Sequence, residues 1–132
     1  MGLGKYISLM KAMMRATSSA AMAEACLTSP KIKDLGEMAA LYELFTGIIG
    51  EDTPVGHMER RKFLLIAAFF FSPGALAGGK MRQGVRDAMA EVTSISPQLV
   101  CRQFRQALFY YDTYGEFRRS VDELLEQVLA GQ

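Results

Sequence analysis

Hydrophobic residues recur along this chain at intervals of three and four positions, which is the spacing of an α-helix, and strand-like alternation is almost absent. The pattern is clearest over residues 34–50, where the apolar positions form one wide stripe. Asp34 has the residue type of a helix N-cap, and Glu37 follows at capping-box spacing. Stripes of the same period predict further helices over residues 4–26 and 116–129.

Residues 63–71 are apolar without interruption. A helix that is apolar on every side has to be buried on every side, so this segment predicts the central helix of the fold. Thr53 and Pro54 have the residue types of an N-cap and a first helical position, which places the predicted start there. A Ser-Pro pair and two glycines then predict a short turn, followed by a helix over residues 80–92.

Ser96 and Pro97 predict the start of another helix, which runs over residues 97–114. Together these elements predict an all-α protein, a compact bundle of five to seven helices in a single domain over residues 1–132. Residues 1–28 are rich in Met and Ala, and they predict a peripheral helix or one that mediates self-association.

Half of the 132 residues are apolar and 22% are charged, a composition typical of a globular domain. The net charge of +1 predicts no strong overall attraction to polyanions, but the charges are unevenly distributed. Residues 54–110 contain eight Lys and Arg against three Asp and Glu, whereas residues 111–132 contain two against five. The middle of the chain is therefore basic and its last part acidic.

The residue types that usually carry catalysis or bind metals are sparse in this chain. His57 is the single histidine, and Cys26 and Cys101 lie 75 positions apart, which is not a metal-ligand spacing. We therefore expect no metal, no cofactor and no enzymatic activity. The longest apolar run has nine residues, whereas a membrane-spanning helix needs about 20, so we expect no membrane span and a cytoplasmic protein.

Residues 74–81 (GALAGGKM) have the glycine and lysine spacing of a phosphate-binding loop. Met81 stands where such a loop has Ser or Thr to hold magnesium, and the preceding segment predicts a helix instead of a strand. The sequence therefore favours a glycine-rich turn between two helices.

Residues 86–106 combine the features of a helix-turn-helix unit, which needs a small residue where its helices cross, a tight turn, and apolar residues that hold the second helix. Ala90 is the small residue, Ser94 stands where the turn usually has glycine, and Thr93 replaces a large aliphatic residue. A serine whose backbone is left-handed is less stable than a glycine in that conformation by about 1 kcal/mol. Whether this turn has the standard helix-turn-helix geometry therefore stays open. The other matching positions are Val85, Met89, Ile95, Ser96, Val100 and Phe104.

These positions resemble the helix-turn-helix superfamily, and the resemblance implies a DNA-binding unit over residues 80–114. In layout, residues 60–129 resemble the C-terminal DNA-binding domain of DnaA-type replication initiators: a basic helix start (RRKFLLIAAFF), a Ser-Pro break, the helix-turn-helix unit and a closing amphipathic helix. The paired-glycine and Arg-Asp-His loop of those initiators is absent, so no base-reading residue is carried over from them. The chain is also similar to small helical proteins from phages and mobile elements of gut bacteria.

The predicted DNA contacts follow from the outer face of the helix over residues 97–114. If Val100, Phe104 and Tyr111 face the core, the opposite face is rich in Arg and Gln, which pair with guanine and adenine in the major groove. No acidic residue occurs from position 93 to position 111. The predicted base-contacting residues are Gln98, Arg102, Gln103, Arg105 and Gln106. The predicted phosphate-contacting residues are Arg60, Arg61, Lys62, Lys80, Arg82 and Arg86.

The leading hypothesis is therefore binding to double-stranded DNA, and a homo-oligomer through residues 1–28 is a further expectation. Two other interpretations stay open. Any amphipathic helix has a polar outer face, and a basic one need not bind DNA. Alternatively, the protein is a non-enzymatic interaction or phage-assembly module that uses its Met-rich first helix or the aromatic cluster with Tyr110, Tyr111 and Tyr114.

Overall fold

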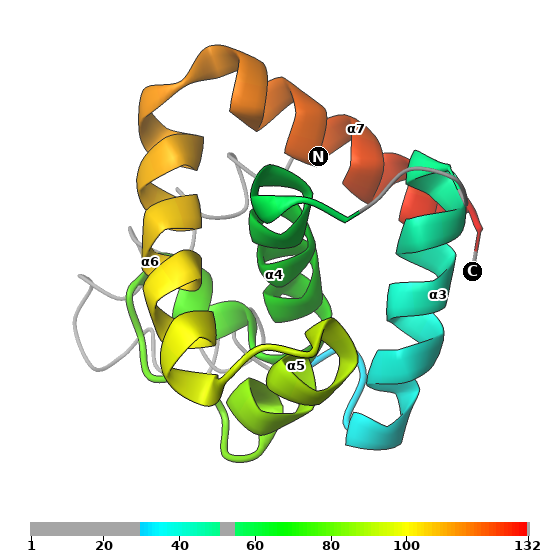
Figure 1. Ribbon diagram of the computed structural model, residues 1–132, viewed down its shortest axis with the longest axis vertical. Helices are drawn as coiled ribbons and strands as arrows, with labels where there is room; N and C mark the ends of the chain where they lie inside the picture. Colours follow the sequence, from blue (N-terminus) through cyan, green and yellow to red (C-terminus); the bar gives the residue numbers. More distant parts are fainter. Residues whose placement is uncertain (1–29, 51–54, 132) are drawn as a thin grey trace, which may run out of the picture.

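The computed structural model describes residues 30–50 and 55–131, and this part of the chain forms five α-helices and two short 3₁₀-helices. No strand occurs among these residues, which confirms the predicted all-α bundle. Figure 1 shows the other α-helices arranged around α4 (His57–Phe71), which lies in the middle. The helix predicted over residues 4–26, and the oligomerising role predicted for residues 1–28, lie outside the described residues.

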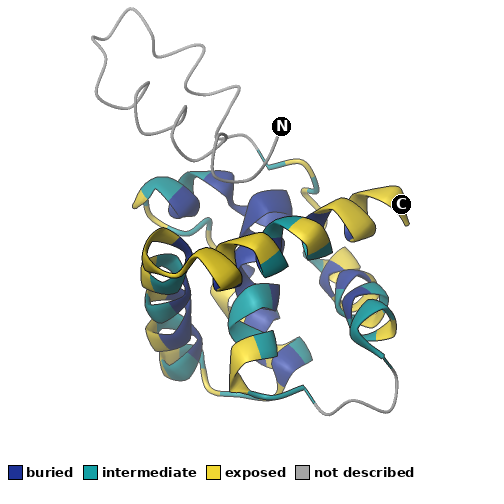
Figure 2. Cartoon of the chain, turned by 90° about the horizontal axis from the view of Figure 1, so that it is seen from above, coloured by how far each residue is buried: buried dark blue, intermediate teal, exposed yellow. Residues whose placement is uncertain are grey.

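The central position of α4 follows from its sequence, because its second half has no polar side to turn toward water. All nine residues from Phe63 to Phe71 are buried, as the uninterrupted apolar run predicts. The Phe63 ring lies against Tyr42 and Phe45 of α3 (Met38–Ile49), with centroid distances of 4.9 and 5.4 Å. Figure 2 shows the same arrangement by burial, with buried residues on α4 and on the inward sides of the surrounding helices.

The observed start of α4 differs from the prediction. The helix begins at His57 and not at Thr53 and Pro54, which lie outside the described residues. Gly56 immediately precedes it with an extended backbone (φ −80°, ψ −176°), a conformation that a continuing helix excludes. The cap predicted from residue types alone is therefore wrong at this helix.

The first described helical segment starts with a 3₁₀-helix, η2 (Leu35–Glu37), which leads into α3. Asp34 accepts a hydrogen bond from the backbone amide of Gly36 at 2.9 Å, so it caps η2 as its residue type predicts. Glu37 precedes α3 without a capping hydrogen bond from its side chain, so the predicted capping box does not form. The helix ends at Gly50, whose φ of 110° stops helical propagation.

α5 (Val85–Thr93) begins five residues later than the helix predicted over 80–92. The preceding Gly84 is left-handed, with a φ of 87°, and a Cβ at this position would lie 2.6 Å from Leu35 Cδ1. Upstream, Arg82 donates its backbone amide to Ser72 Oγ at 2.8 Å. This bond ties the segment before α5 to the end of α4 and keeps it out of a helix.

α6 (Pro97–Thr113) and α7 (Gly115–Ala130) form a corner that side-chain hydrogen bonds hold. Tyr114, which is extended, separates the two helices, and Gly115 starts α7 instead of ending α6. The Tyr111 hydroxyl donates to Asp122 Oδ1 at 2.7 Å, and Arg118 donates to the carbonyls of Tyr111 and Asp112 at 2.9 and 2.8 Å. The arginine therefore satisfies carbonyl groups that the end of α6 leaves without helical partners.

Candidate nucleic-acid interface

α5 and α6 are joined by a turn whose first residue is a left-handed serine. Ser94 has φ 59° and ψ 37°, the conformation in which a helix-turn-helix unit usually has glycine. The Ile95 amide donates to the Ala90 carbonyl at 3.2 Å, and the Ser94 amide donates to the Glu91 carbonyl at 3.3 Å. This pair of bonds is a Schellman motif, which offsets the cost of a left-handed serine by satisfying the last carbonyls of α5.

Thr93 shows how a polar residue fits a position that usually carries an aliphatic side chain. The residue is buried, and its hydroxyl donates to the Met89 carbonyl at 2.6 Å. Because the hydroxyl is satisfied within its own helix, only its methyl group needs to pack against neighbours. Ala90, the small residue of the predicted crossing, is also buried.

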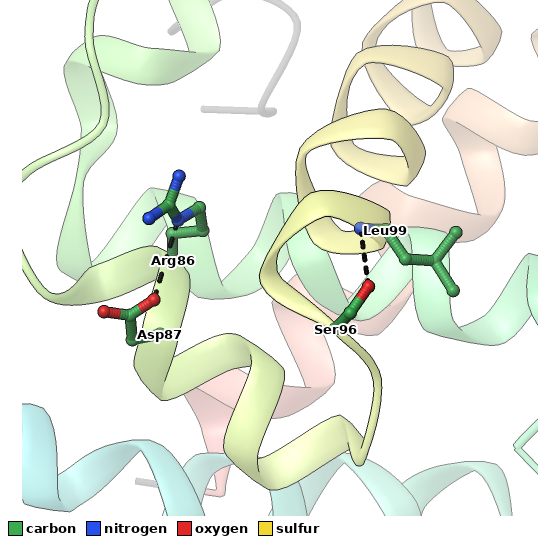
Figure 3. A network of polar contacts seen from close by, with 4 residues as sticks. All are labelled: Arg86, Asp87, Ser96 and Leu99. Atoms are coloured by element: carbon green, nitrogen blue, oxygen red, sulfur yellow. Dashed lines mark hydrogen bonds and ion pairs between the residues drawn. The ribbon is translucent and has the colours of Figure 1, made fainter.

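The N-terminus of α6 is capped as the sequence predicts. Ser96 Oγ accepts a hydrogen bond from the Leu99 backbone amide at 3.1 Å (Figure 3). Pro97 occupies the first helical position. Beyond this cap, Gln98, Arg102 and Arg105 are exposed, as predicted. Among the described residues, neither arginine forms a hydrogen bond or ion pair, so the acidic helix α7 does not neutralise them.

Basic side chains from both helices and from the segment before α5 border one groove of about 1080 Å³, which we call the α5–α6 groove. Asp87 is the single acidic residue of the described chain that lines it. Asp87 pairs with the neighbouring Arg86 at 3.6 Å, but both side chains are exposed and such pairs are weak (Figure 3). The groove therefore has a positive rim. The basic residues that line it are Lys80, Arg82, Arg86 and Arg105.

Gln103, predicted to contact bases, is only 2% exposed, so this prediction is wrong. It lies three residues after Val100 and four before Ala107, which places it on the buried side of α6. Its Nε2 lies 3.5 Å from His57 Nδ1 of α4, and its Oε1 is buried without a partner among the described residues. Gln103 therefore belongs to the α4–α6 interface.

Gln106 and Arg61 were also predicted to contact DNA, but the structure joins them to each other. Gln106 is half-buried, and its Oε1 accepts hydrogen bonds from Arg61 Nε at 3.2 Å and from Arg61 Nη2 at 2.8 Å. The Arg61 guanidinium also lies 5.5 Å from the ring centroid of Tyr110. Both side chains are thus engaged in holding α4 against α6 and are not displayed on the outer face.

The other residues predicted to contact phosphates also fall into two groups, those engaged or half-buried within the protein and those exposed at the groove. Arg82 is held by the carbonyls of Phe71 at 2.9 Å, Lys33 at 3.3 Å and Ile32 at 3.4 Å, so its guanidinium has a structural role. Arg60 and Lys62 are half-buried on α4, outside the groove lining. The Arg60 Nε is buried without a hydrogen-bond partner in the described chain, and Lys62 Nζ lies 6.0 Å from the Phe117 ring centroid. The cations of this set that are exposed and border the groove are Lys80 and Arg86.

The aromatic cluster at the α6–α7 corner is only partly a packing element. Tyr111 is buried and Tyr110 is half-buried, but Phe109 and Tyr114 are 57% and 51% exposed. Their ring centroids lie 6.2 Å apart in an edge-to-face arrangement. The sequence pattern points to this cluster but does not show which of its rings reach solvent.

The described residues contain no group of three or more His, Cys, Asp or Glu side chains placed to hold a metal ion. In the same part of the chain, no helix combines the length and the apolar character needed to cross a membrane. Residues 74–81 include most of η3 (Pro73–Ala77) and the turn that follows it, in which Gly78 has a left-handed backbone. This segment is the turn between helices that the sequence favours.

Comparisons with protein-family models, with curated proteins and with solved structures found no significant match.

Proposed function

We propose that this protein binds double-stranded DNA, with α6 in the major groove and the cations beside α5 on the phosphate backbone. The observation that carries this proposal is the outer face of the α5–turn–α6 unit. Gln98, Arg102 and Arg105 are exposed on α6, and the exposed Lys80 and Arg86 border the same groove as Arg105. In helix-turn-helix proteins the second helix reads bases while neighbouring cations position the backbone.

The charge distribution supports the proposal in spite of a net charge of only +1. α6 contains no acidic residue before Asp112, so no carboxylate on its first four turns repels a phosphate. The arginines that face solvent have planar donors that match the acceptor pair on guanine, and Gln98 has the donor and acceptor that match adenine. Local charge, and not net charge, thus sets the expected affinity.

A salt titration of binding to a duplex of about 20 base pairs tests this function. Lys80 and Arg86, the two exposed cations proposed to contact phosphates, predict that log K falls linearly with log salt, with a slope of about −1.8. Replacing Lys80 by Gln should reduce the size of that slope by about 0.9. Fluorescence anisotropy of a labelled duplex, titrated at several salt concentrations, measures the slope for the unchanged protein and for the Lys80 variant. Binding that is undetectable at low salt, or that does not depend on salt, contradicts the proposal.

A second candidate function, attachment to another protein or to a second copy, is supported by the exposed aromatic pair at the α6–α7 corner. Exposed aromatic residues are the side chains that most often anchor protein interfaces. Phe109 and Tyr114 are more than half exposed and contact each other, so a partner could cover both without rearrangement of the corner.

Light scattering after size-exclusion chromatography distinguishes this second function from DNA binding. If the aromatic pair mediates self-association, the mass rises with protein concentration, and replacing Phe109 and Tyr114 by Ser returns it to about 14.6 kDa. Leu129→Ser is the matched control, since Leu129 is 47% exposed near the other end of α7. A mass that stays monomeric at all concentrations excludes a dimer through this pair.

A further inference from the structure

The α5–α6 groove has an apolar floor that the proposed DNA contacts do not use. Met81, Phe104 and Leu108 line it, together with Ala75 and Cys101. Phe104 and Ala75 belong to the buried core, whereas Met81 and Leu108 are half-buried and pack at its edge. The floor is therefore a solvent-facing extension of the core between two helices, which is a common setting for small-ligand sites.

The rim of the groove has the opposite character, because its cations come from three different elements. Lys80 stands on the segment before α5, Arg86 on α5 and Arg105 on α6. Neither Lys80 nor Arg105 has a hydrogen-bond or ion-pair partner in the described part of the chain. Among the described residues that line the groove, these three cations outnumber the one carboxylate, Asp87, and leave an excess of positive charge at the mouth.

We propose that the α5–α6 groove binds a small amphiphilic anion, whose acidic head lies among Lys80, Arg86 and Arg105 while its apolar body covers Met81 and Leu108. A volume of about 1080 Å³ is sufficient for a ligand of this kind. A DNA backbone supplies the charge but little apolar surface, so it would leave the floor exposed to water. The inference rests on the proposed function in one respect, since ligand and DNA would share the rim cations and compete.

Octanoate is a suitable probe, and isothermal titration of the full-length protein without DNA tests its binding. Two reference compounds separate the two parts of the site. Acetate has the carboxylate without the long alkyl chain, and 1-octanol has the alkyl chain without the negative charge. Octanoate is expected to bind at least about tenfold more tightly than either, because charge-assisted contacts and apolar burial act together. Equal binding of octanoate and 1-octanol would overturn the proposal.

Charge reversal locates the binding site. Arg105→Glu and Lys80→Glu are each expected to lower octanoate affinity by about tenfold, because each removes an attraction and adds a repulsion. Arg119→Glu is the matched control, since Arg119 is exposed on α7 and does not line the groove. All three positions are exposed, and circular dichroism of each variant checks that the fold is retained. Unchanged affinity in both groove variants contradicts the assignment.

Competition tests the shared cations separately from binding. At constant ionic strength, octanoate should weaken binding of a labelled duplex, whereas the same concentration of acetate should not. If octanoate binds and the duplex is retained at saturation, the shared-cation part of the proposal is wrong. If octanoate binds and DNA does not bind under any condition, the groove assignment stands and the proposed function fails.

Discussion

Replacing Arg102 and Arg105 together by alanine is expected to lower the affinity for a preferred duplex by about 30-fold or more. A bidentate arginine contact to a base contributes roughly 1–3 kcal/mol, so two such contacts contribute at least about 2 kcal/mol. Both side chains are exposed on α6 and have no partner among the described residues, so their loss should leave the fold unchanged. The preferred duplex is obtained by enrichment from a random pool, and anisotropy titrations give the affinities.

Arg119→Ala is the control for this pair, because it removes an exposed arginine of α7 that lies outside the α5–α6 groove. It should change the affinity less than about twofold. The double variant should leave the salt slope nearly unchanged, because Arg102 and Arg105 are proposed to contact bases and not phosphates. Equal effects of the control and of the double variant would mean that binding follows overall charge and does not use α6. An unaffected double variant would remove the basis for DNA binding through this helix.

Replacing Phe63 by alanine is expected to lower the free energy of unfolding by about 3–5 kcal/mol. Phe63 is fully buried at the centre of the bundle, and its ring contacts Tyr42 and Phe45 from α3. The variant loses the transfer free energy of the ring and leaves a cavity that the packed helices fill only in part. Since small domains are stable by only about 5–15 kcal/mol, this loss is a large fraction of the total. Urea unfolding followed by circular dichroism measures it.

Phe109→Ala provides the matched comparison, with the same side chain removed from a position that is 57% exposed. We expect it to change the free energy of unfolding by less than about 1 kcal/mol, because little buried surface is lost. A Phe63 variant that is no less stable than the Phe109 variant would show that α4 is not the centre of the core.

Helix periodicity and residue types at helix ends predicted much of this fold. The helix predicted over residues 97–114 is observed as Pro97–Thr113, and Ser96 caps it. The nine-residue apolar run predicted a central buried helix, and α4 has that position. The cap was predicted because capping hydrogen bonds form between residues only a few positions apart. The central helix was predicted because a helix that is apolar on all sides has to be buried inside the protein.

The starts of α4 and α5 were predicted less well than the start of α6. For α5 the reason is that contacts with distant parts of the chain determine where the helix begins. Residues 80–83 contain no glycine or proline, so their sequence does not exclude a helix. In the structure, however, the Arg82 side chain donates hydrogen bonds to a carbonyl at the end of α4 and to carbonyls about 50 positions earlier in the chain. The helix can therefore begin only after this anchored segment. Local propensity does not contain such a constraint.

The candidate site was predicted in part. Gln98, Arg102 and Arg105 are exposed as expected, but Gln103 is buried. A signal for its burial was present, since it lies at helical spacing from Val100 and Ala107. Glutamine at an inward position nevertheless requires a polar neighbour, and the sequence alone does not show that His57 of α4 is near it.

The sequence by itself determined the helical class, the buried central helix, the capped start of α6 and the basic character of its outer face. Only the tertiary structure decided which polar residues are available to a partner. Arg61, Gln106 and Arg82 are engaged in contacts between elements far apart in the chain, whereas Lys80, Arg86 and Arg105 meet at one groove. The physical reason is that helical periodicity follows from spacing along one segment, but the partner of a long polar side chain depends on which helices pack together.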